Sequence, residues 1–372
     1  MIRRSRGSLT LLAVSFLVVA CRAGGPTGSI APSSVAALAT PSASSTPVAA
    51  ATPTPVCAHR PPPSWVTAAS NPKDGVPDPA GRIFFGQVER VDDLLGQIVA
   101  PLFAIDADGS DLVQVLDCEM ERPRVSPDGS RLAFSIVMSD GTWQVATSAV
   151  DGSELRVLTK TAGAAETPDW APDGASLIYS YSPNRCALPT CVEDGSFHQT
   201  LWRMNVDGSD PTLIGDPKTY DWESRLSPDW RRVVIGRIRP DSDRNAIIVR
   251  DLATGKERSA TPNTTDLEHP DWSPDGRWIV YNTLKSPDGR DLQSIERVSS
   301  EDPTAKPVVL AGDFGHAAYK PAYSPDGARI VFGCDGSVCL MDADGSHRET
   351  LRGVGGVELN HFAWGVTPKA AP

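Results

Sequence analysis

The chain has 372 residues, of which 40% are hydrophobic, and its 35 basic and 46 acidic side chains give a formal net charge of −11. This length can bury a sizeable core, and the negative charge argues against nucleic acid and against an anionic membrane surface as partners. Composition alone does not identify the partner.

The first twenty residues have the layout of a secretory signal. Basic residues precede an apolar stretch, residues 9–20, that is too short to span a bilayer comfortably. The stretch ends in the sequence VVAC, residues 18–21, which resembles the bacterial lipobox. That resemblance implies cleavage before Cys21 and a diacylglycerol on its thiol. The predicted location is therefore the bacterial cell envelope, lipid-anchored to the membrane and facing the periplasm or the exterior.

A low-complexity segment follows the cysteine. Residues 23–56 carry no charged side chain and are almost all Ala, Ser, Thr, Pro and Gly. Such a segment cannot bury enough apolar surface to offset its ordering entropy, so residues 21–56 are predicted to be the lipidated cysteine and a disordered tether. We assign residues 57–80 to an N-terminal extension, residues 81–366 to the folded domain and residues 367–372 to a tail.

Five segments of the folded region share one pattern. The equivalent positions lie 45 to 56 residues apart, which is the length that a four-stranded propeller blade needs. The segments are ERPRVSPDGSRLAFS from Glu121, ETPDWAPDGASLIYS from Glu166, WESRLSPDWRRVVIG from Trp222, EHPDWSPDGRWIVYN from Glu268 and YKPAYSPDGARIVFG from Tyr319.

Each segment predicts a first strand, a tight Ser-Pro-Asp-Gly turn and an apolar second strand. The third segment, which belongs to the predicted blade four, departs from this pattern, because Trp230 replaces the glycine. Residues 82–88 match a second strand without a first, and residues 360–364 match a first strand without a second. We therefore predict an all-β fold, a six-bladed β-propeller of four-stranded antiparallel blades closed by the C-terminal strand joining the first blade.

The pattern P-x-[WY]-S-P-D-G-x-x-[ILV]-x-[FY] resembles the WD40-like repeat of TolB-like propellers over residues 82–364. The resemblance implies a propeller that mainly binds other macromolecules of the cell envelope. Two features depart from TolB: residues 57–80 are too few for its α/β domain, and TolB is not lipidated. We expect a monomeric tethered binding or scaffold protein without a cofactor, which recognises a protein, peptide or glycan and touches the membrane only through its anchor.

Six cysteines remain after Cys21, and an even number in an oxidising compartment predicts disulfides. Two pairs have C-x4-C spacing and close local loops, and the third pair follows by elimination. A shared zinc site is excluded, because the repeat places the two local pairs in blades three and six, on opposite sides of the ring. The predicted pairs are Cys57–Cys118, Cys186–Cys191 and Cys334–Cys339.

Histidine supplies the only enzymatic alternative. The chain has no G-x-S-x-G elbow and no room for an α/β-hydrolase domain. Oligogalacturonate lyases, however, resemble TolB-like propellers and hold a metal at the channel mouth with histidines. His269, His316 and His361 fall in or near connections that enter first strands, at one end of the ring. The alternative function is a metal-dependent lyase or hydrolase, and the other interpretation is rim histidines without a ligand role.

A second set of candidates comes from the first strands. The position that faces the channel carries Arg124, Asp169, Arg225 and Asp271 in successive blades. This alternation predicts a chain of ion pairs between neighbouring blades, because unpaired charges would be costly there. Recognition is expected at the end of the ring with the longest connections, residues 182–199, 237–244 and 285–290.

Overall fold

The computed structural model describes residues 52–57, 81–88, 90–92, 97–183, 198–239, 244–261, 266–284, 293–302, 304–312, 317–353 and 359–366. All of these belong to one compact unit, Thr52–Pro372. They form strands and turns without a helix, so the all-β prediction is confirmed for this part of the chain. Accordingly, the described residues hold no helix that is long and apolar enough to cross a membrane. Cys21, Cys186, Cys191 and His316 lie outside the described residues.

Three sheets each contain four antiparallel strands in chain order. The first comprises β12 (Asp221–Leu226), β13 (Arg232–Arg239), β14 (Arg244–Asp251) and β15 (Glu257–Ser259). The second comprises β16 (Leu267–Trp272), β17 (Trp278–Thr283), β18 (Ser294–Ser299) and β19 (Val308–Ala311). The third comprises β20 (Ala318–Tyr323), β21 (Arg329–Cys334), β22 (Ser337–Asp342) and β23 (Glu349–Gly353).

The other strands form one 12-stranded sheet in the order β11-β10-β9-β8-β6-β5-β4-β3-β1-β24, with β2 beside β3 and β7 beside β6. Two junctions make it continuous. The long strand β4 pairs with β3 near its start and with β5 near its end, and a single parallel bridge between Trp143 and Ala164 joins β6 to β8. The strands are β1 (Arg82–Gln87), β2 (Arg90–Asp92), β3 (Gln97–Asp106), β4 (Val113–Val125), β5 (Arg131–Val137), β6 (Trp143–Ala149), β7 (Arg156–Val157), β8 (Ala164–Trp170), β9 (Ser176–Ser182), β10 (Thr200–Asn205), β11 (Thr212–Leu213) and β24 (Leu359–Gly365).

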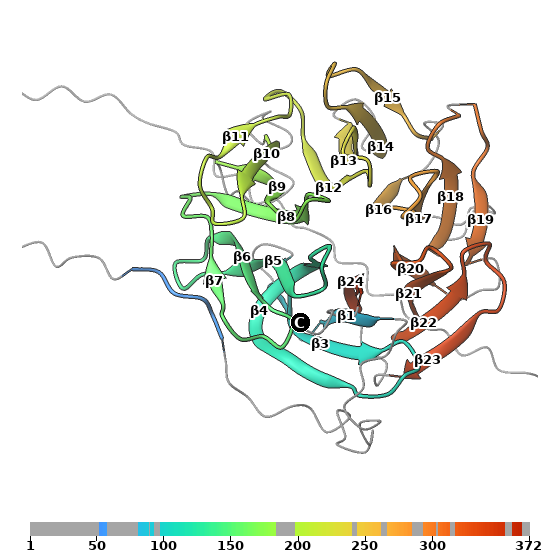
Figure 1. Ribbon diagram of the computed structural model, residues 1–372, viewed down its shortest axis with the longest axis horizontal. Coiled ribbons are helices and arrows are strands. Elements are labelled where there is room, and N and C mark those ends of the chain that lie inside the picture. The colour runs from blue at the N-terminus through green and yellow to red at the C-terminus, as the bar shows by residue number, and fades with distance from the viewer. Residues whose placement is uncertain are drawn as a thin grey trace, which may run out of the picture. The chain divides into compact units, whose positions relative to one another are not determined.

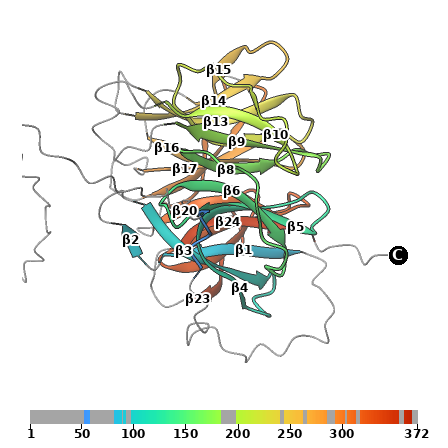
Figure 2. The same cartoon turned by 90° about the vertical axis from the view of Figure 1, so that its left-hand side faces the viewer.

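The strands of this unit are arranged around a common centre, with β8, β12, β16, β20 and β24 nearest to it (Figure 1). The first strands contact one another in the cyclic order β24, β4, β8, β12, β16, β20 and back to β24. The C-terminal strand β24 pairs with β1, which places Trp364 opposite Ile83 and Phe362 opposite Phe85. The side view shows β24, β1 and β3 next to one another (Figure 2).

The Ser-Pro-Asp-Gly turns have the expected chemistry. In the first, Ser126 Oγ donates to Asp128 Oδ1 at 2.6 Å, and the same oxygen accepts the amide of Ser130 at 3.0 Å. The segment from Trp222 keeps this turn without glycine, because Trp230 itself adopts a left-handed φ of 58°. The guanidinium of Arg203 lies 4.8 Å from its ring centroid, a cation–π contact that helps to hold the strained residue.

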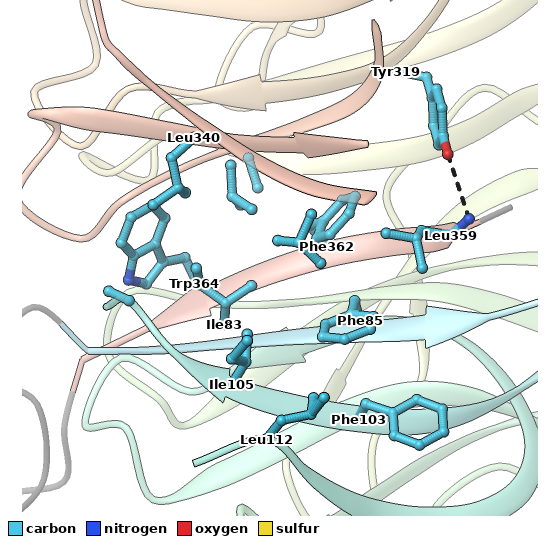
Figure 3. Packing of buried hydrophobic residues seen from close by; sticks show 14 residues of the cluster. Ile83, Phe85, Phe103, Ile105, Leu112, Tyr319, Leu340, Leu359, Phe362 and Trp364 are labelled. Carbon is cyan, nitrogen blue, oxygen red and sulfur yellow. Dashed lines mark hydrogen bonds between the residues drawn. The ribbon is translucent and has the colours of Figure 1, made fainter. Parts of the chain in front are cut away.

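The C-terminal strand is fixed by apolar packing (Figure 3). Phe362 is 3% exposed, and its ring centroid lies 6.1 Å from that of Phe85. The same cluster includes Leu340 from the neighbouring sheet, so the sheet of β24, β1 and β3 packs against the sheet of β20 to β23. The hydroxyl oxygen of Tyr319 accepts the amide of Leu359 at 3.5 Å.

Two of the predicted disulfides, Cys57–Cys118 and Cys334–Cys339, are present. The segment before Cys57 differs from the prediction. The amide of Val56 donates to the carbonyl of Val137 at 2.9 Å, and the carbonyl of Thr54 accepts the amide of Ser139 at 2.8 Å. Residues 54–56, which we assigned to the disordered tether, are therefore hydrogen-bonded to the folded domain, because the nearby disulfide holds them against it.

Candidate functional site

Each first strand contains one residue more than its partner strand accommodates. Each pairing has a register shift at the same place, which is the signature of a β-bulge. At every bulge one non-glycine residue has a left-handed φ between 30° and 56°. We call these six residues the central ring: Arg122, Thr167, Glu223, His269, Lys320 and His361.

The left-handed backbone of a non-glycine residue costs on the order of 1–3 kcal/mol, and it persists only where the surroundings enforce it. Here the enforcing contacts come from the second strand of the preceding repeat. The amide of Thr167 donates to Ser135 Oγ at 3.0 Å, and the amide of Lys320 donates to Asn282 Oδ1 at 3.1 Å. Hydrogen bonds between neighbouring repeats thus hold the bulges that direct these residues.

Glu223 is the hub of the central ring and is fully buried. Its Oε1 lies 2.6 Å from Nδ1 of His269, 3.2 Å from Nε2 of His361 and 3.4 Å from Nε of Arg122. The two imidazole rings meet edge to face with centroids 4.8 Å apart. Three ring residues from three other first strands therefore converge on the carboxylate of Glu223.

The charge states in this cluster follow from burial and from neighbours. Burial acts to raise the pKa of Glu223, but His269, His361 and Arg122 outweigh it and hold the pKa well below its usual range. Burial lowers the pKa of His361 well below its usual range, against the opposing effect of Glu223. Burial also disfavours the charged form of Arg122, but Glu121 and Glu223 reverse this and raise its pKa. An anionic carboxylate therefore faces a neutral imidazole and a charged guanidinium.

A second polar layer lies two residues further along four of the first strands, which carry Arg124, Asp169, Arg225 and Asp271. Nε of Arg124 lies 3.9 Å from Asp169 Oδ1, and its Nη1 lies 4.0 Å from Asp271 Oδ1. Arg225 pairs with neither aspartate and donates from Nη1 to the carbonyl of Ser224 at 2.9 Å. The predicted chain of ion pairs running through Arg225 is therefore wrong, because Arg124 serves both carboxylates.

The physical reason is a competing partner for each carboxylate. Asp169 Oδ2 accepts the amide of Leu226 at 2.8 Å, and Asp271 Oδ2 accepts the amide of Tyr323 at 3.0 Å. Both amides belong to the next first strand, so each aspartate binds the backbone of the following sheet. Burial raises the pKa of Asp169 to about 7, although Arg124 opposes the shift.

The structure brings two of the three candidate histidines together. His269 and His361 meet at Glu223, while His316 lies outside the described residues. Sequence reasoning missed Glu223 and Arg122. The available signal was their shared place in the repeat, since both stand where His269 stands in its own segment.

Sheets of four antiparallel strands, arranged around a ring of bulged first strands, define the chain as a β-propeller protein. The model of the TolB beta propeller domain, PD40, matches residues 112–309, which is more than half of the chain. The chain belongs to this family.

Individual relatives agree with this assignment. The uncharacterized protein Atu1656 of Agrobacterium fabrum is 28% identical over 244 residues, covering 62% of this chain and 75% of the relative. The Tol-Pal system protein TolB of Francisella tularensis subsp. tularensis is 28% identical over 177 residues, covering 47% of this chain but 36% of TolB. The crystal structure of TolB from Acinetobacter baumannii is similar with a TM-score of 0.60 and 19% identity, covering 77% of this chain and 67% of that one. This last likeness shows the fold alone.

Proposed function

We propose that the chain is a binding or scaffold protein of the bacterial cell envelope, anchored by a lipid on Cys21 and carrying a six-bladed propeller on a tether. Membership of the TolB propeller family supports an envelope-associated binding role. The partner is a protein, peptide or glycan, and the protein acts as a monomer with no membrane contact beyond its anchor.

The count of six blades rests on how the large sheet divides. Strands β24, β1 and β3 with the start of β4 make one blade, the end of β4 with β5 to β7 makes a second, and β8 to β11 make a third. One bridge alone links the second and third. With the three separate sheets the total is six, and the pairing of β24 with β1 closes the ring.

The central ring is the observation that carries the binding role. Six bulges hold mostly charged or hydrogen-bonding side chains at the same level, each at a cost in backbone strain. The central ring lies closer to the start than to the end of most first strands. First strands begin at the end of the propeller where second strands finish, since Ala164 at the start of β8 pairs with Ser182 at the end of β9. Three predicted long connections leave second strands at this end, so we place recognition here; most of their residues lie outside the described ranges.

Photo-crosslinking from matched positions tests this placement. Ala162 and Asp173 are both exposed, and they flank β8 at its opposite ends. A photoreactive residue at Ala162 should trap a discrete partner in the producing cells, whereas one at Asp173 should not. Equal trapping at both positions, or trapping at Asp173 alone, contradicts the proposal.

The lipid anchor has its own test. The variant Cys21→Ser should release the protein from the membrane fraction.

One observation favours the second candidate, a metal-dependent lyase or hydrolase. His269 and His361 meet at a carboxylate, although they stand in segments far apart in the sequence. This candidate predicts turnover of a trapped peptide or glycan that stops when metal is removed. A binding protein instead returns its partner intact.

A further inference from the structure

The central ring concentrates metal-ligating atoms. Glu223, His269 and His361 each offer one donor atom, and these atoms all lie within 4.8 Å of one another. We propose that these three residues bind a divalent transition-metal ion of the zinc class. Two imidazoles and a carboxylate are a donor set that such ions take in proteins. The site stands whether or not the propeller binds a partner, because it is built from residues of the chain alone.

Glu268 and Asn245 lie beside His269, on the side of its ring away from Glu223. Nε2 of His269 lies 3.6 Å from Glu268 Oε2, while its Nδ1 points to Glu223. Glu268 is itself oriented, because its Oε1 accepts from Asn245 Nδ2 at 3.1 Å. A carboxylate at the far nitrogen of a histidine fixes the tautomer and the ring plane of metal-bound imidazoles. Glu268, held by Asn245, thus lies within ion-pair distance of the His269 nitrogen that faces away from Glu223.

His361 provides an independent indication. It is 7% exposed, and its Nδ1 is buried without a hydrogen-bond partner among the described residues. Buried polar atoms without a partner are rare in folded proteins, and an ion is one of the few explanations for them. The opposite nitrogen of the ring touches Glu223. The Nδ1 atom of His361 therefore has no hydrogen bond to a described residue that binding a metal would break.

Acidic side chains outnumber basic side chains around the three proposed ligands, which favours a bound cation. The carboxylates of Glu121, Glu166, Glu223 and Glu268 interact electrostatically with this cluster, against the cations Arg122 and Lys320. Among these described side chains, the acidic groups outnumber the basic groups by two. A divalent ion supplies the missing charge, and burial makes that compensation valuable.

Arg122 also contacts the carboxylate of Glu223, but this contact leaves the carboxylate available to a metal ion. Its Nε lies 3.4 Å from Glu223 Oε1, but its Nη1 also pairs with Glu121 at 2.5 Å. Because Arg122 keeps this second partner, Glu223 can turn to a metal and leave the guanidinium paired. Three protein ligands also leave a coordination position open, as at metal sites that bind water or an exogenous group.

Calorimetric titration of zinc chloride alone into the full chain, first treated with a chelator, tests the site. We expect saturable binding of a single ion per chain. Glu223→Gln and His361→Gln should each weaken the affinity by more than about 100-fold, and Glu268→Gln, outside the ligand set, by about 10–100-fold. His347→Gln is the matched control, because His347 is exposed and pairs with Asp342 on the surface; its affinity should equal that of the wild type.

Zinc that binds with unchanged affinity in His361→Gln and Glu268→Gln is held elsewhere, and this result overturns the proposal, as does the absence of saturable binding. Circular dichroism checks the fold of each variant. If Glu223→Gln does not fold, Glu268→Gln and the visible spectrum of wild-type protein with cobalt decide the matter. Nitrogen and oxygen ligation predicts cobalt bands without thiolate charge transfer, and thiolate bands contradict the assigned ligands.

Discussion

The contact of Arg124 with Asp169 predicts a measurable coupling energy. The perturbations are Arg124→Met, Asp169→Asn and the double variant. Methionine keeps an unbranched apolar chain, and asparagine keeps an oxygen for the amide of Leu226, which Asp169 accepts at 2.8 Å. The cycle therefore removes the charges and leaves the backbone hydrogen bond between sheets in place.

The magnitude follows from distance and burial. The charged groups are 3.9 Å apart, and their side chains are 13% and 15% exposed. At that separation two unit charges attract by about 4 kcal/mol at an effective dielectric constant of about 20. Arg124 also serves Asp271, and burial costs offset part of the attraction, so we expect a coupling of about 1–2 kcal/mol. Arg124→Met alone should cost about 3 kcal/mol, because it leaves two buried carboxylates without a cation.

Urea unfolding followed by tryptophan fluorescence, at about pH 8 where Asp169 is largely ionised, measures each free energy. The matched control is the cycle of Arg225→Met and Asp271→Asn, for which we expect a coupling below about 0.5 kcal/mol, since these residues do not pair. Additive effects in the Arg124 cycle, or equal coupling in the control cycle, would refute this account of the layer.

Further outcomes follow from burial, cross-linking and protonation. Phe362→Ala should lower the free energy of unfolding by about 3–5 kcal/mol, measured by thermal or urea unfolding. Val366→Ala, at a 40% exposed position, should change it by less than about 0.5 kcal/mol. Similar losses in the two variants would contradict the packing of β24. Replacing Cys57 and Cys118 by serine removes a link across 61 residues and should cost about 4 kcal/mol, and a loss below about 1 kcal/mol would speak against the bond. Because the pKa of Asp169 is raised from 3.8 to about 7, its contribution to stability is fully present below 3.8 and is lost as the pH rises through about 7. Urea midpoints across that range should therefore fall more steeply for the wild type than for Asp169→Asn, and parallel curves would exclude the shift.

The sequence was informative wherever the chemistry is local or periodic. The turn of Ser126 and Asp128 follows from a four-residue motif, and the position of Trp364 in the repeat predicted its pairing beside β1. A bulge is different, because it inserts one residue and breaks the alternation on which face assignments depend. This is why the channel position was sought at Arg124 and its equivalents, while Glu223 was missed. Arg225 was misassigned because the aspartate nearby binds a backbone amide that composition cannot reveal.

The pairing of β1 with β24 also bears on how the chain is made. The ribosome releases β1 before every other strand of the propeller, and its partner β24 is the last strand to appear. During that interval β1 has an unpaired edge, and the buried side chains of Phe84 and Phe85 lack one wall of their core. Contacts between residues so distant in sequence form slowly, and exposed edges favour aggregation meanwhile. Until β24 is in place, the chain therefore exposes this apolar edge for longer than a fold assembled from neighbouring strands alone.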